Sequence, residues 1–341
     1  MQQVVVEQFG GVEVLELRDV PTPTPGAGQV LIRLTSIGMN HADLMGRRGE
    51  YKLSTGDPPF TPGLEGGGLI EAVGEGVAAS RIGERVCLAP DAVRGGGRPG
   101  TYGTHYVCDA DEALVAPEAL PDDQLGAVWL PYFTAWGALI WKANLQAGQV
   151  VACPAASSST ALAAAQIAKH HGATTIGLTT SPDKVQQLAE HFDHVVVTHD
   201  RDPATGERTM RPWHREMKQL TGGRGVDVFF DPVAAGAYLS TEVRCLAQYG
   251  RVVVYGLLGA AGEVDVTPLI RKHASIVGYV NDELFAAGRS AWMAGVEHIF
   301  GGFTAEAYRQ TLAASFSLDD VREAHEVMER GDHVGKMVLR P

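Results

Sequence analysis

Short apolar runs recur along the second part of the chain, and their spacing is the feature that most limits its fold. They lie at Val150–Cys153, Thr175–Leu178, His194–Val197, Val226–Phe230 and Arg251–Tyr255. Segments with helical periodicity separate most of these runs. Alternation of this kind is typical of a parallel sheet with helices on both faces. We therefore expect a doubly wound α/β domain that begins near Asp122.

The first 120 or so residues have a different pattern, with short alternating runs broken by proline and glycine clusters. The runs lie at Gln3–Val6, Val30–Leu34, Gly68–Ala72, Arg85–Leu88 and Tyr102–Cys108, and the breaks at Pro21–Gly26 and Gly95–Gly97. This pattern predicts a mostly antiparallel β domain. After Pro268 we expect the chain to return to that domain through a helix near Leu318–Glu329 and a strand at Lys336–Leu339. A length of 341 residues with 45% apolar residues suits two cores.

End signals delimit three helices of the α/β domain. Ser158 or Ser159 can cap the first, and Gly172 can end it. Ser181-Pro182-Asp183 opens the second, and the third is expected at about Ala237–Gln248 with Gly250 as its stop. The polar stretch Asp200–Arg211 contains Pro203 and Gly206, and we expect a surface loop there.

The charge of the chain narrows the class of its partners. A formal net charge of −12 and a pI near 5.4 disfavour nucleic acid and anionic membrane surfaces, because like charges repel. A small-molecule substrate fits better. We expect a cytoplasmic protein, since no apolar run reaches about 18 residues and Met1–Val4 is not a signal-peptide start. The four cysteines are far apart and suggest neither disulfides nor a structural zinc site.

Three motifs in the first domain carry a family resemblance. They are Gly38–Asp43, Pro62–Gly66, and Val73–Val77 ahead of Ile82–Val86. They resemble the substrate domain of the medium-chain dehydrogenase/reductase superfamily, and Ala165–Lys169 and Gly225–Val233 resemble its nucleotide domain. The resemblance covers essentially the whole chain. It implies a GroES-like, mostly antiparallel β domain and a Rossmann domain, with cofactor and substrate in the cleft between them.

The resemblance also implies domain boundaries. The GroES-like domain would comprise residues 1–121, with a return over 281–341. The Rossmann domain would comprise residues 122–267, with its sheet extended by about 275–280. By resemblance, two chains would pair through that last strand, Ser275–Val280, to form a homodimer.

The metal-binding positions of the zinc-dependent relatives are altered here. Asn40, Leu64 and Leu130 stand where those enzymes have zinc ligands, and Ala42 stands where they have a proton-relay hydroxyl. The four-cysteine lobe is replaced by Arg94–Gly100. Because leucine cannot bind zinc, the resemblance points to the zinc-free quinone and enone reductase branch, and we expect no metal.

The nucleotide-binding turn lacks its usual glycines. Ala156, Ser158 and Ala161 stand where a GxGxxG motif would have glycine, while the strand-turn-helix order is kept. Small residues and hydroxyl donors, including Ser159 and Thr160, can still hold a pyrophosphate at a helix N-terminus. The alternative is a nucleotide site that has decayed. We favour binding, because later nucleotide features survive.

The end of the second strand of the α/β domain favours NADPH over NADH. An NAD site has an acid there for the ribose hydroxyls, whereas this chain has Thr179, Thr180 and Ser181. Lys184 supplies a cation one turn later, although it is alternatively a solvated helix residue. Asp183 is better placed as a partner of the helix dipole.

Further cofactor contacts come from the resemblance alone. Backbone groups of Tyr255, Gly256 and Leu257 and those around Gly278–Val280 would hold the carboxamide, and Lys336 would lie near the cofactor. Thr198 replaces a tyrosine that stacks on the nucleotide in many relatives. Other candidates for cofactor contacts are Thr134 and His41.

The candidate catalytic residues are Asn40, Asp43 and Tyr51. Asn40 and Asp43 keep the Asn-x-x-Asp spacing of the zinc-free branch, and Arg47–Tyr51 resembles its R-x-G-x-Y continuation. An amide and a phenol can stabilise the enolate that forms when hydride reaches an enone, and Tyr51 or water can supply the proton. Alternatively, Asn40 is a turn residue that bonds its own backbone, and Tyr51 is a packing aromatic.

These features predict an NADPH-dependent, zinc-independent oxidoreductase that reduces quinones or conjugated enones. One alternative is an enoyl-thioester reductase of the same superfamily, although the sequence does not locate a cationic patch for the carrier phosphate. The other is a non-catalytic nucleotide-binding protein that keeps the fold. The missing turn glycines favour this second alternative more than in a typical member.

Overall fold

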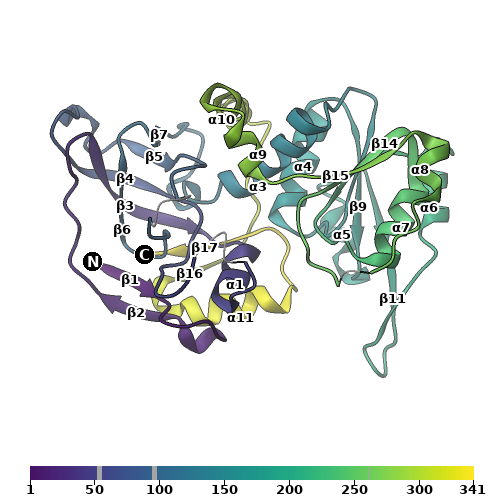
Figure 1. The fold of residues 1–341 in the computed structure, drawn as a ribbon, viewed down its shortest axis with the longest axis horizontal. Helices are drawn as coiled ribbons and strands as arrows, with labels where there is room; N and C mark the ends of the chain where they lie inside the picture. Colours follow the sequence, from purple (N-terminus) through teal and green to yellow (C-terminus); the bar gives the residue numbers. More distant parts are fainter. Residues whose placement is uncertain (52–55, 94–97, 261) are drawn as a thin grey trace. The chain divides into compact units, whose positions relative to one another are not determined.

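The computed structural model describes residues 1–51, 56–93, 98–260 and 262–341. The chain forms two compact units, of which the first comprises Met1–Leu130 with Phe300–Pro341 and the second Pro131–Ile299 (Figure 1). An antiparallel sheet dominates the first unit and a parallel sheet the second, which confirms the predicted fold class. The boundaries predicted at 121/122 and at 281 stay predictions.

The first unit is built on a seven-stranded sheet in the order β16-β17-β3-β4-β5-β7, with β6 paired to β3. Its neighbouring strands are antiparallel except β16 and β17, and the yellow C-terminal strand β17 lies beside β3 in Figure 1. Its strands are β3 (Gln29–Gly38), β4 (Gly66–Val73), β5 (Arg85–Leu88), β6 (His105–Asp109), β7 (Ala113–Val115), β16 (Leu312–Ser317) and β17 (Lys336–Arg340). Two further strands, β1 (Gln2–Val5) and β2 (Glu16–Asp19), form a separate antiparallel pair.

Glycines at the start of β4 allow unusually close contact with neighbouring backbone. A Cβ atom at Gly68 would lie 2.0 Å from the carbonyl oxygen of Arg33 in β3, and one at Gly67 would lie 2.6 Å from the backbone of Leu125. No side chain fits at either position. These glycines therefore let the start of β4 pack closely against β3. As a result Glu65, the residue before β4, lies close to the end of β3.

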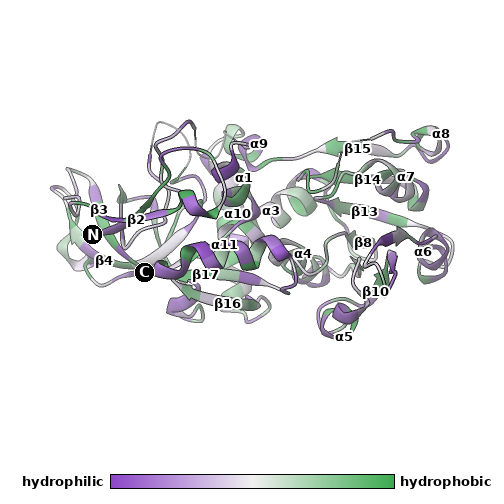
Figure 2. Ribbon diagram, turned by 90° about the horizontal axis from the view of Figure 1, so that it is seen from below, coloured by the Kyte–Doolittle hydropathy of each residue, from purple (hydrophilic) through white to green (hydrophobic). Residues whose placement is uncertain are grey.

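Two helices, α1 (His41–Arg48) and α11 (Val321–Arg330), are joined by a partly buried ion pair in the first unit. The Arg47 side chain is only 1% exposed and its Nη2 pairs with Glu329, which also accepts from Arg48 at 2.6 Å. Gly49, with φ of 76°, ends α1 in the left-handed conformation. Hydrophilic and hydrophobic residues alternate along α11 (Figure 2), as expected for a helix that covers a core.

The second unit contains a six-stranded parallel sheet in the order β10-β9-β8-β13-β14-β15. The strand order reverses between β8 and β13, which is where such sheets bind their ligands, outside the carboxyl ends of the strands. The strands are β8 (Val150–Cys153), β9 (Thr174–Thr179), β10 (His194–Val197), β13 (Val226–Asp231), β14 (Leu246–Val254) and β15 (Ser275–Gly278).

Short helices alternate with these strands. They are α4 (Ser159–His170), α5 (Val185–Leu188), α6 (His214–Leu220), α7 (Gly236–Cys245), α8 (Thr267–Lys272) and α9 (Asn281–Ala286), and both α3 (Trp129–Trp136) and α10 (Arg289–Thr304) run from one unit into the other. Single turns lie at Val12–Val14, Ala79–Arg81, Asp122–Gln124, Pro182–Lys184 and Leu318–Asp320, and a π-helix lies at Gly137–Lys142. Within the described ranges, no helix has both the length and the apolar character needed to cross a membrane.

Two expectations about the second unit were wrong. The helix expected to run to Gln248 ends at Cys245, because Leu246 is buried and already pairs with Val226 in the sheet. The left-handed residue of that turn is Tyr249, with φ of 62°, rather than Gly250. The polar stretch 200–211 lies on the surface as expected, where part of it forms an exposed hairpin of β11 (His199–Arg201) and β12 (Arg208–Met210) that projects from the unit in Figure 1.

The Arg47–Glu329 pair should contribute strongly to stability. Nε and Nη1 of Arg47 have no hydrogen-bond acceptor among the described residues, so Glu329 is the main compensation for a buried charge. We expect Glu329→Gln to lower the free energy of unfolding by about 3 kcal/mol, measured by urea denaturation. The control Arg48→Gln removes only the more exposed partner and should cost less than about 1 kcal/mol. Equal losses in the two variants would contradict this account.

Candidate active site

The turn between β3 and α1 carries the first two candidate catalytic residues. Asn40 occupies the N-cap position of α1, and its backbone N–H donates to Asp43 Oδ2 at 2.8 Å. Asp43 is 1% exposed, and its other oxygen accepts the backbone N–H of Gly63 at 3.2 Å. The Asn-x-x-Asp spacing thus closes the start of the helix and ties it to the segment before β4. Both oxygens of Asp43 thus accept backbone N–H groups of the first unit.

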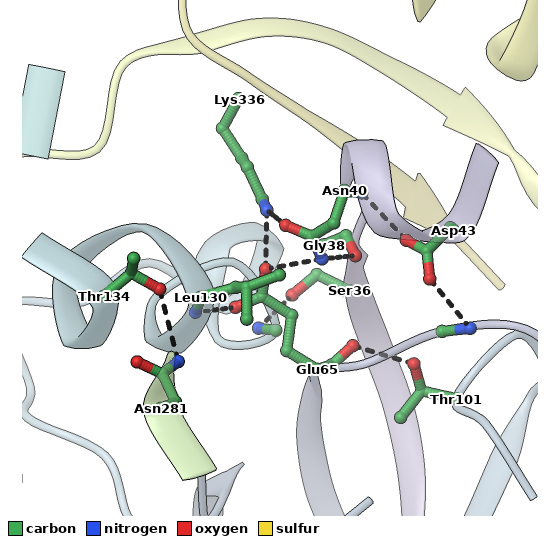
Figure 3. A network of polar contacts seen from close by, with 12 residues as sticks. Ser36, Gly38, Asn40, Asp43, Glu65, Thr101, Leu130, Thr134, Asn281 and Lys336 are labelled. Atoms are coloured by element: carbon green, nitrogen blue, oxygen red, sulfur yellow. Dashed lines mark hydrogen bonds and ion pairs between the residues drawn. The ribbon is translucent and has the colours of Figure 1, made fainter. Parts of the chain in front are cut away.

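Glu65 is the centre of the polar network, although the sequence pattern around it predicted no role for it. It is 2% exposed. Its Oε1 accepts from Lys336 Nζ at 2.5 Å and from Asn40 Nδ2 at 3.1 Å, and its Oε2 accepts the backbone N–H of Leu130 at 2.9 Å (Figure 3). The available signal was a single acid between Leu64 and three glycines, in a segment that was otherwise apolar. A charge in such a segment requires a partner.

Lys336 lies on β17 and supplies that partner. Its side chain is 1% exposed, and Nζ donates to Asn40 Oδ1 at 2.6 Å as well as to Glu65. The expected position of Lys336 near the cofactor stays a prediction. Within the first unit, Lys336 bonds Asn40 and forms a buried ion pair with Glu65.

The side chain of Asn40 has no unused donor. Its Nδ2 group has two protons, which are directed to Gly38 O and to Glu65 Oε1, both at 3.1 Å. Its Oδ1 accepts from Lys336. The predicted role of Asn40 as a hydrogen-bond donor to a substrate carbonyl would therefore require one of these bonds to be given up.

The third catalytic candidate lies apart from this network. Tyr51 follows the end of α1 and is half-buried, next to residues 52–55, which are outside the described part of the chain. No bond joins it to Asn40 or Asp43 in the described contacts. His41 is the first residue of α1 and is exposed.

Behind Asp43 lies a second buried polar chain. Tyr102 donates to Asp43 Oδ2 at 3.4 Å, and His325 Nε2 lies 3.3 Å from the Tyr102 hydroxyl. Burial raises the pKa of Asp43 to about 7, against the lowering effect of the bond from Asn40. Burial and nearby Arg47 lower the pKa of His325 to about 3. The chain thus favours a neutral imidazole and a carboxyl that is easily protonated.

In the second unit, the turn between β8 and α4 keeps the strand-turn-helix order. Ser158 caps α4 by accepting the N–H of Ala161 at 3.2 Å. The backbone N–H groups of Ser159 and Thr160 have no acceptor among the described residues, so they remain available to an anion. Ala156 is fully buried and its N–H donates to Leu178 O at 3.0 Å, and its contact with the cofactor stays a prediction.

The end of β9 lies against this turn. Lys184 Nζ donates to Ser157 Oγ at 3.2 Å, which brings a cation to the β8–α4 turn. Thr180 and Ser181 are half-buried. Thr179 is buried and uses its hydroxyl to accept the N–H of Ser181 at 3.1 Å.

The other cofactor candidates differ in accessibility. Thr198 is fully buried and bonds the carbonyl of Thr179, so it backs the end of β9. Tyr255 stacks on Phe230, with ring centroids 3.9 Å apart, and Leu257 is 72% exposed. Gly256 is half-buried, and Thr134 is half-buried and accepts from Asn281 at 3.2 Å.

Known proteins resemble the chain over its whole length. The profile of the alcohol dehydrogenase GroES-like domain matches residues 26–121, and that of the zinc-binding dehydrogenases matches residues 160–297. The quinone oxidoreductase of Homo sapiens is 31% identical over 346 residues, which cover 99% of this chain and 97% of that protein. The quinone oxidoreductase of Lama guanicoe is 32% identical with the same coverage. The chain belongs to the medium-chain dehydrogenase/reductase superfamily, in its quinone oxidoreductase-like branch.

Other members of the superfamily extend the comparison. The synaptic vesicle membrane protein VAT-1 homolog of Homo sapiens is 28% identical, covering 99% of this chain and 86% of that protein. A solved NAD-dependent alcohol dehydrogenase matches with a TM-score of 0.84 at 27% identity and covers the full length of both chains. The GroES-like and Rossmann-like parts of the predicted fold are thereby confirmed.

The metal positions of this medium-chain dehydrogenase/reductase are described by the structure only in part. Leu64 and Leu130 are half-buried, and Asn40 is engaged as above. In residues 1–51, 56–93, 98–260 and 262–341, no group of three or more histidine, cysteine, aspartate or glutamate side chains could hold a metal ion. Residues 94–97 of the altered lobe lie outside these ranges. The zinc-free assignment stays a prediction.

Asp43 should make stability depend on pH. Its pKa of about 7 exceeds the ordinary value of about 4, so the folded state holds a proton that the unfolded chain releases. The resulting stabilisation is complete below about pH 4 and is lost as the pH rises through about 7. Asp43→Asn removes this titration, so its melting temperature relative to the parent should rise between pH 4 and pH 8.

The control for this prediction is Asp19→Asn, which alters an exposed carboxylate of the same unit. The difference in melting temperature between this variant and the parent should stay constant between pH 4 and pH 8. A parallel pH dependence of Asp43→Asn and the parent, measured by thermal denaturation, would show that Asp43 does not titrate as described.

Proposed function

We propose that this oxidoreductase reduces quinones or conjugated enones with NADPH and without zinc. The observation that carries the proposal is the buried Lys336–Glu65 pair, which bonds Asn40 and the backbone of Leu130. One position that would hold zinc in related enzymes thus bonds a protein cation, and the backbone of another bonds the carboxylate paired with that cation. A substrate whose carbonyl is conjugated needs only modest stabilisation of its oxygen, because the incoming charge is shared along the conjugated system.

Several residues of the second unit suit the cofactor. The free N–H groups of Ser159 and Thr160 at the start of α4 suit a pyrophosphate, since a helix N-terminus attracts anions. Lys184 and the hydroxyl of Ser181 suit the 2′-phosphate of NADPH. When bound, this cofactor supplies the hydride. The protein binds and orients it and does not need an acid at the end of β9, where NAD sites have one.

The remaining chemistry falls to the substrate-binding residues. Tyr51 can donate a hydrogen bond to the substrate oxygen or protonate the reduced product, and water can replace it in the second role. Asp43 orients the turn that carries Asn40. The enoyl-thioester alternative requires a cationic site for a carrier phosphate, and the non-catalytic alternative requires that no substrate is turned over.

A panel assay tests the activity. Full-length protein treated with a chelator should oxidise NADPH in the presence of one or more quinones or enones, with added zinc giving no increase. Turnover of enoyl thioesters alone would favour the first alternative. Tight NADPH binding with no turnover of any compound would favour the non-catalytic one, and activity lost with about one bound zinc per chain would refute the zinc-free assignment.

Cofactor preference follows from the end of β9. We expect NADPH to bind more tightly than NADH by roughly 10- to 100-fold, the usual value of contacts to a charged phosphate. Ser181→Asp should flatten or reverse the preference, because a carboxylate repels the 2′-phosphate. Fluorescence titration of both cofactors measures this, with Asp183→Asn as a control whose exposed side chain lies two residues away. Equal dissociation constants in the parent would contradict the assignment.

We also propose a homodimer that pairs through β15, the outermost strand of the parallel sheet. An unpaired strand edge invites association. Exposed apolar side chains lie close to it in sequence, including Ile270 at 81% and Val280 at 50% exposure. Light scattering at micromolar concentration should give twice the chain mass, and Val277→Pro should shift the mass towards the monomer. A monomeric parent would contradict the proposal.

A further inference from the structure

The ammonium of Lys336 has a donor to spare. A lysine ammonium carries three N–H donors, and the acceptors described for Lys336 are Asn40 Oδ1 and Glu65 Oε1. No third acceptor exists among the residues that the structure describes. The side chain is 1% exposed, so bulk water does not readily serve it. A buried donor without an acceptor costs free energy, and such a group calls for an explanation.

The position of Lys336 Nζ indicates what its remaining N–H could bind. The amide of Asn40, at the first metal-ligand position, bonds Nζ directly. The backbone N–H of Leu130, at the third position, bonds the same carboxylate as Nζ, and Leu64, at the second position, precedes that carboxylate in the chain. Figure 3 shows Lys336, Asn40, Glu65 and Leu130 around one point. A positive charge therefore bonds the side chain at the first of these positions directly, and it reaches the backbone at the third through the carboxylate of Glu65.

We propose that Lys336 is a catalytic residue whose free N–H binds the substrate oxygen that becomes negative during reduction. This inference rests on the proposed function and names its electrophile. It also restricts the substrates to compounds with a carbonyl oxygen conjugated to the carbon that is reduced. Asn40, whose own amide protons are engaged, becomes the residue that aims the ammonium.

For an enone, a hydride that NADPH would supply by losing one C–H bond and becoming NADP⁺ forms a new C–H bond at the β-carbon. The pair of the C=C bond moves to join the α-carbon and the carbonyl carbon, and the C=O pair moves onto oxygen. The enolate oxygen then accepts the Lys336 hydrogen bond. A proton from water adds at the α-carbon, the C=O bond is restored, and hydroxide is left to the solvent. Lys336 keeps its proton throughout.

Glu65 has a separate task in this arrangement. Removing an ammonium from water is costly unless a counter-charge lies close to it. Glu65 provides that charge, and its second oxygen is fixed by the N–H of Leu130. Glu65 is thus a positioning residue, which holds Lys336 charged and aimed while one N–H stays open.

A binding experiment tests the role of Lys336 without turnover. The probe is 4-nitrophenolate, an aromatic oxyanion whose absorbance reports binding, titrated into the full chain in the presence of NADP⁺. We expect Lys336→Met to weaken phenolate binding by about 10- to 100-fold, as for a hydrogen bond to a charged group. Binding of the neutral ether 4-nitroanisole should change less than about 2-fold, because its uncharged oxygen accepts only a weak hydrogen bond from the ammonium. Equal phenolate affinity in parent and variant, or no phenolate binding by the parent, overturns the inference.

Further variants separate the possible roles. Lys336→Met leaves a buried carboxylate unpaired, so the double variant Lys336→Met/Glu65→Gln provides a neutral, folded comparison and should bind phenolate as weakly. Lys336→Arg, which keeps the charge, should recover part of the affinity. Arg33→Gln removes an exposed cation of the same unit and should leave phenolate binding unchanged. Recovery of phenolate affinity in the double variant would mean that Lys336 serves only to neutralise Glu65, and would overturn the inference.

Cofactor binding and turnover complete the test. The NADPH dissociation constant of Lys336→Met should stay within about 2-fold of the parent, whereas a 10-fold loss would assign Lys336 to the cofactor and overturn the inference. Where the parent turns over an enone, the variant should lose about 10²- to 10³-fold in kcat with little change in KM. A parent that reduces nothing defeats the proposed function, and the phenolate titration still decides the role of Lys336.

Discussion

A buried ion pair between Glu65 and Lys336 organises the first unit. Both side chains are 1% exposed. Lys336 lies on β17 and Glu65 directly precedes β4, and their bonds reach Asn40 at the start of α1 and the N–H of Leu130. Removing one partner of a buried ion pair costs free energy, because the charge that remains has lost both its water and its counter-charge. The pair therefore links four segments, although Glu65 and Lys336 lie far apart along the chain. The glycines of β4 serve the same arrangement, since they let the segment that carries Glu65 approach β3.

The second unit shows how a nucleotide-type turn can form without its glycines. Ala155 adopts a φ of 49°, in the left-handed region that glycine usually fills, and the cost of about 1 kcal/mol is borne by the surrounding fold. Ser158 caps the helix, and Lys184 bonds the hydroxyl of Ser157. Hydrogen bonds from side chains thus stabilise a turn that, in proteins with a GxGxxG motif, depends on the flexibility of glycine. The turn lacks flexible glycines, but the N–H groups of Ser159 and Thr160 still have no acceptor among the described residues.

The sequence predicted best those elements whose start and end depend on neighbouring residues in the chain. The run from Val150 to Ala161 carries its own strand, turn and cap, and the structure has each of them in place. The end of α7 was predicted less well, because pairing of Leu246 with Val226 in the sheet outweighed the stop signal at Gly250. Glu65 was missed altogether. Its partner is 271 residues away, and neither residue has a local pattern that announces an ion pair.

The distance along the chain between Lys336 and its partners has a consequence for synthesis on the ribosome. Asn40 emerges 296 residues before Lys336, and the whole second unit is translated in the interval. Until β17 is made, β3 lacks one neighbour and Glu65 lacks its counter-charge. The nascent first unit must therefore wait with an open strand edge and an uncompensated acid, while the second unit has its complete sequence first. The first unit can therefore complete its sheet and its central ion pair only after the second unit has been translated.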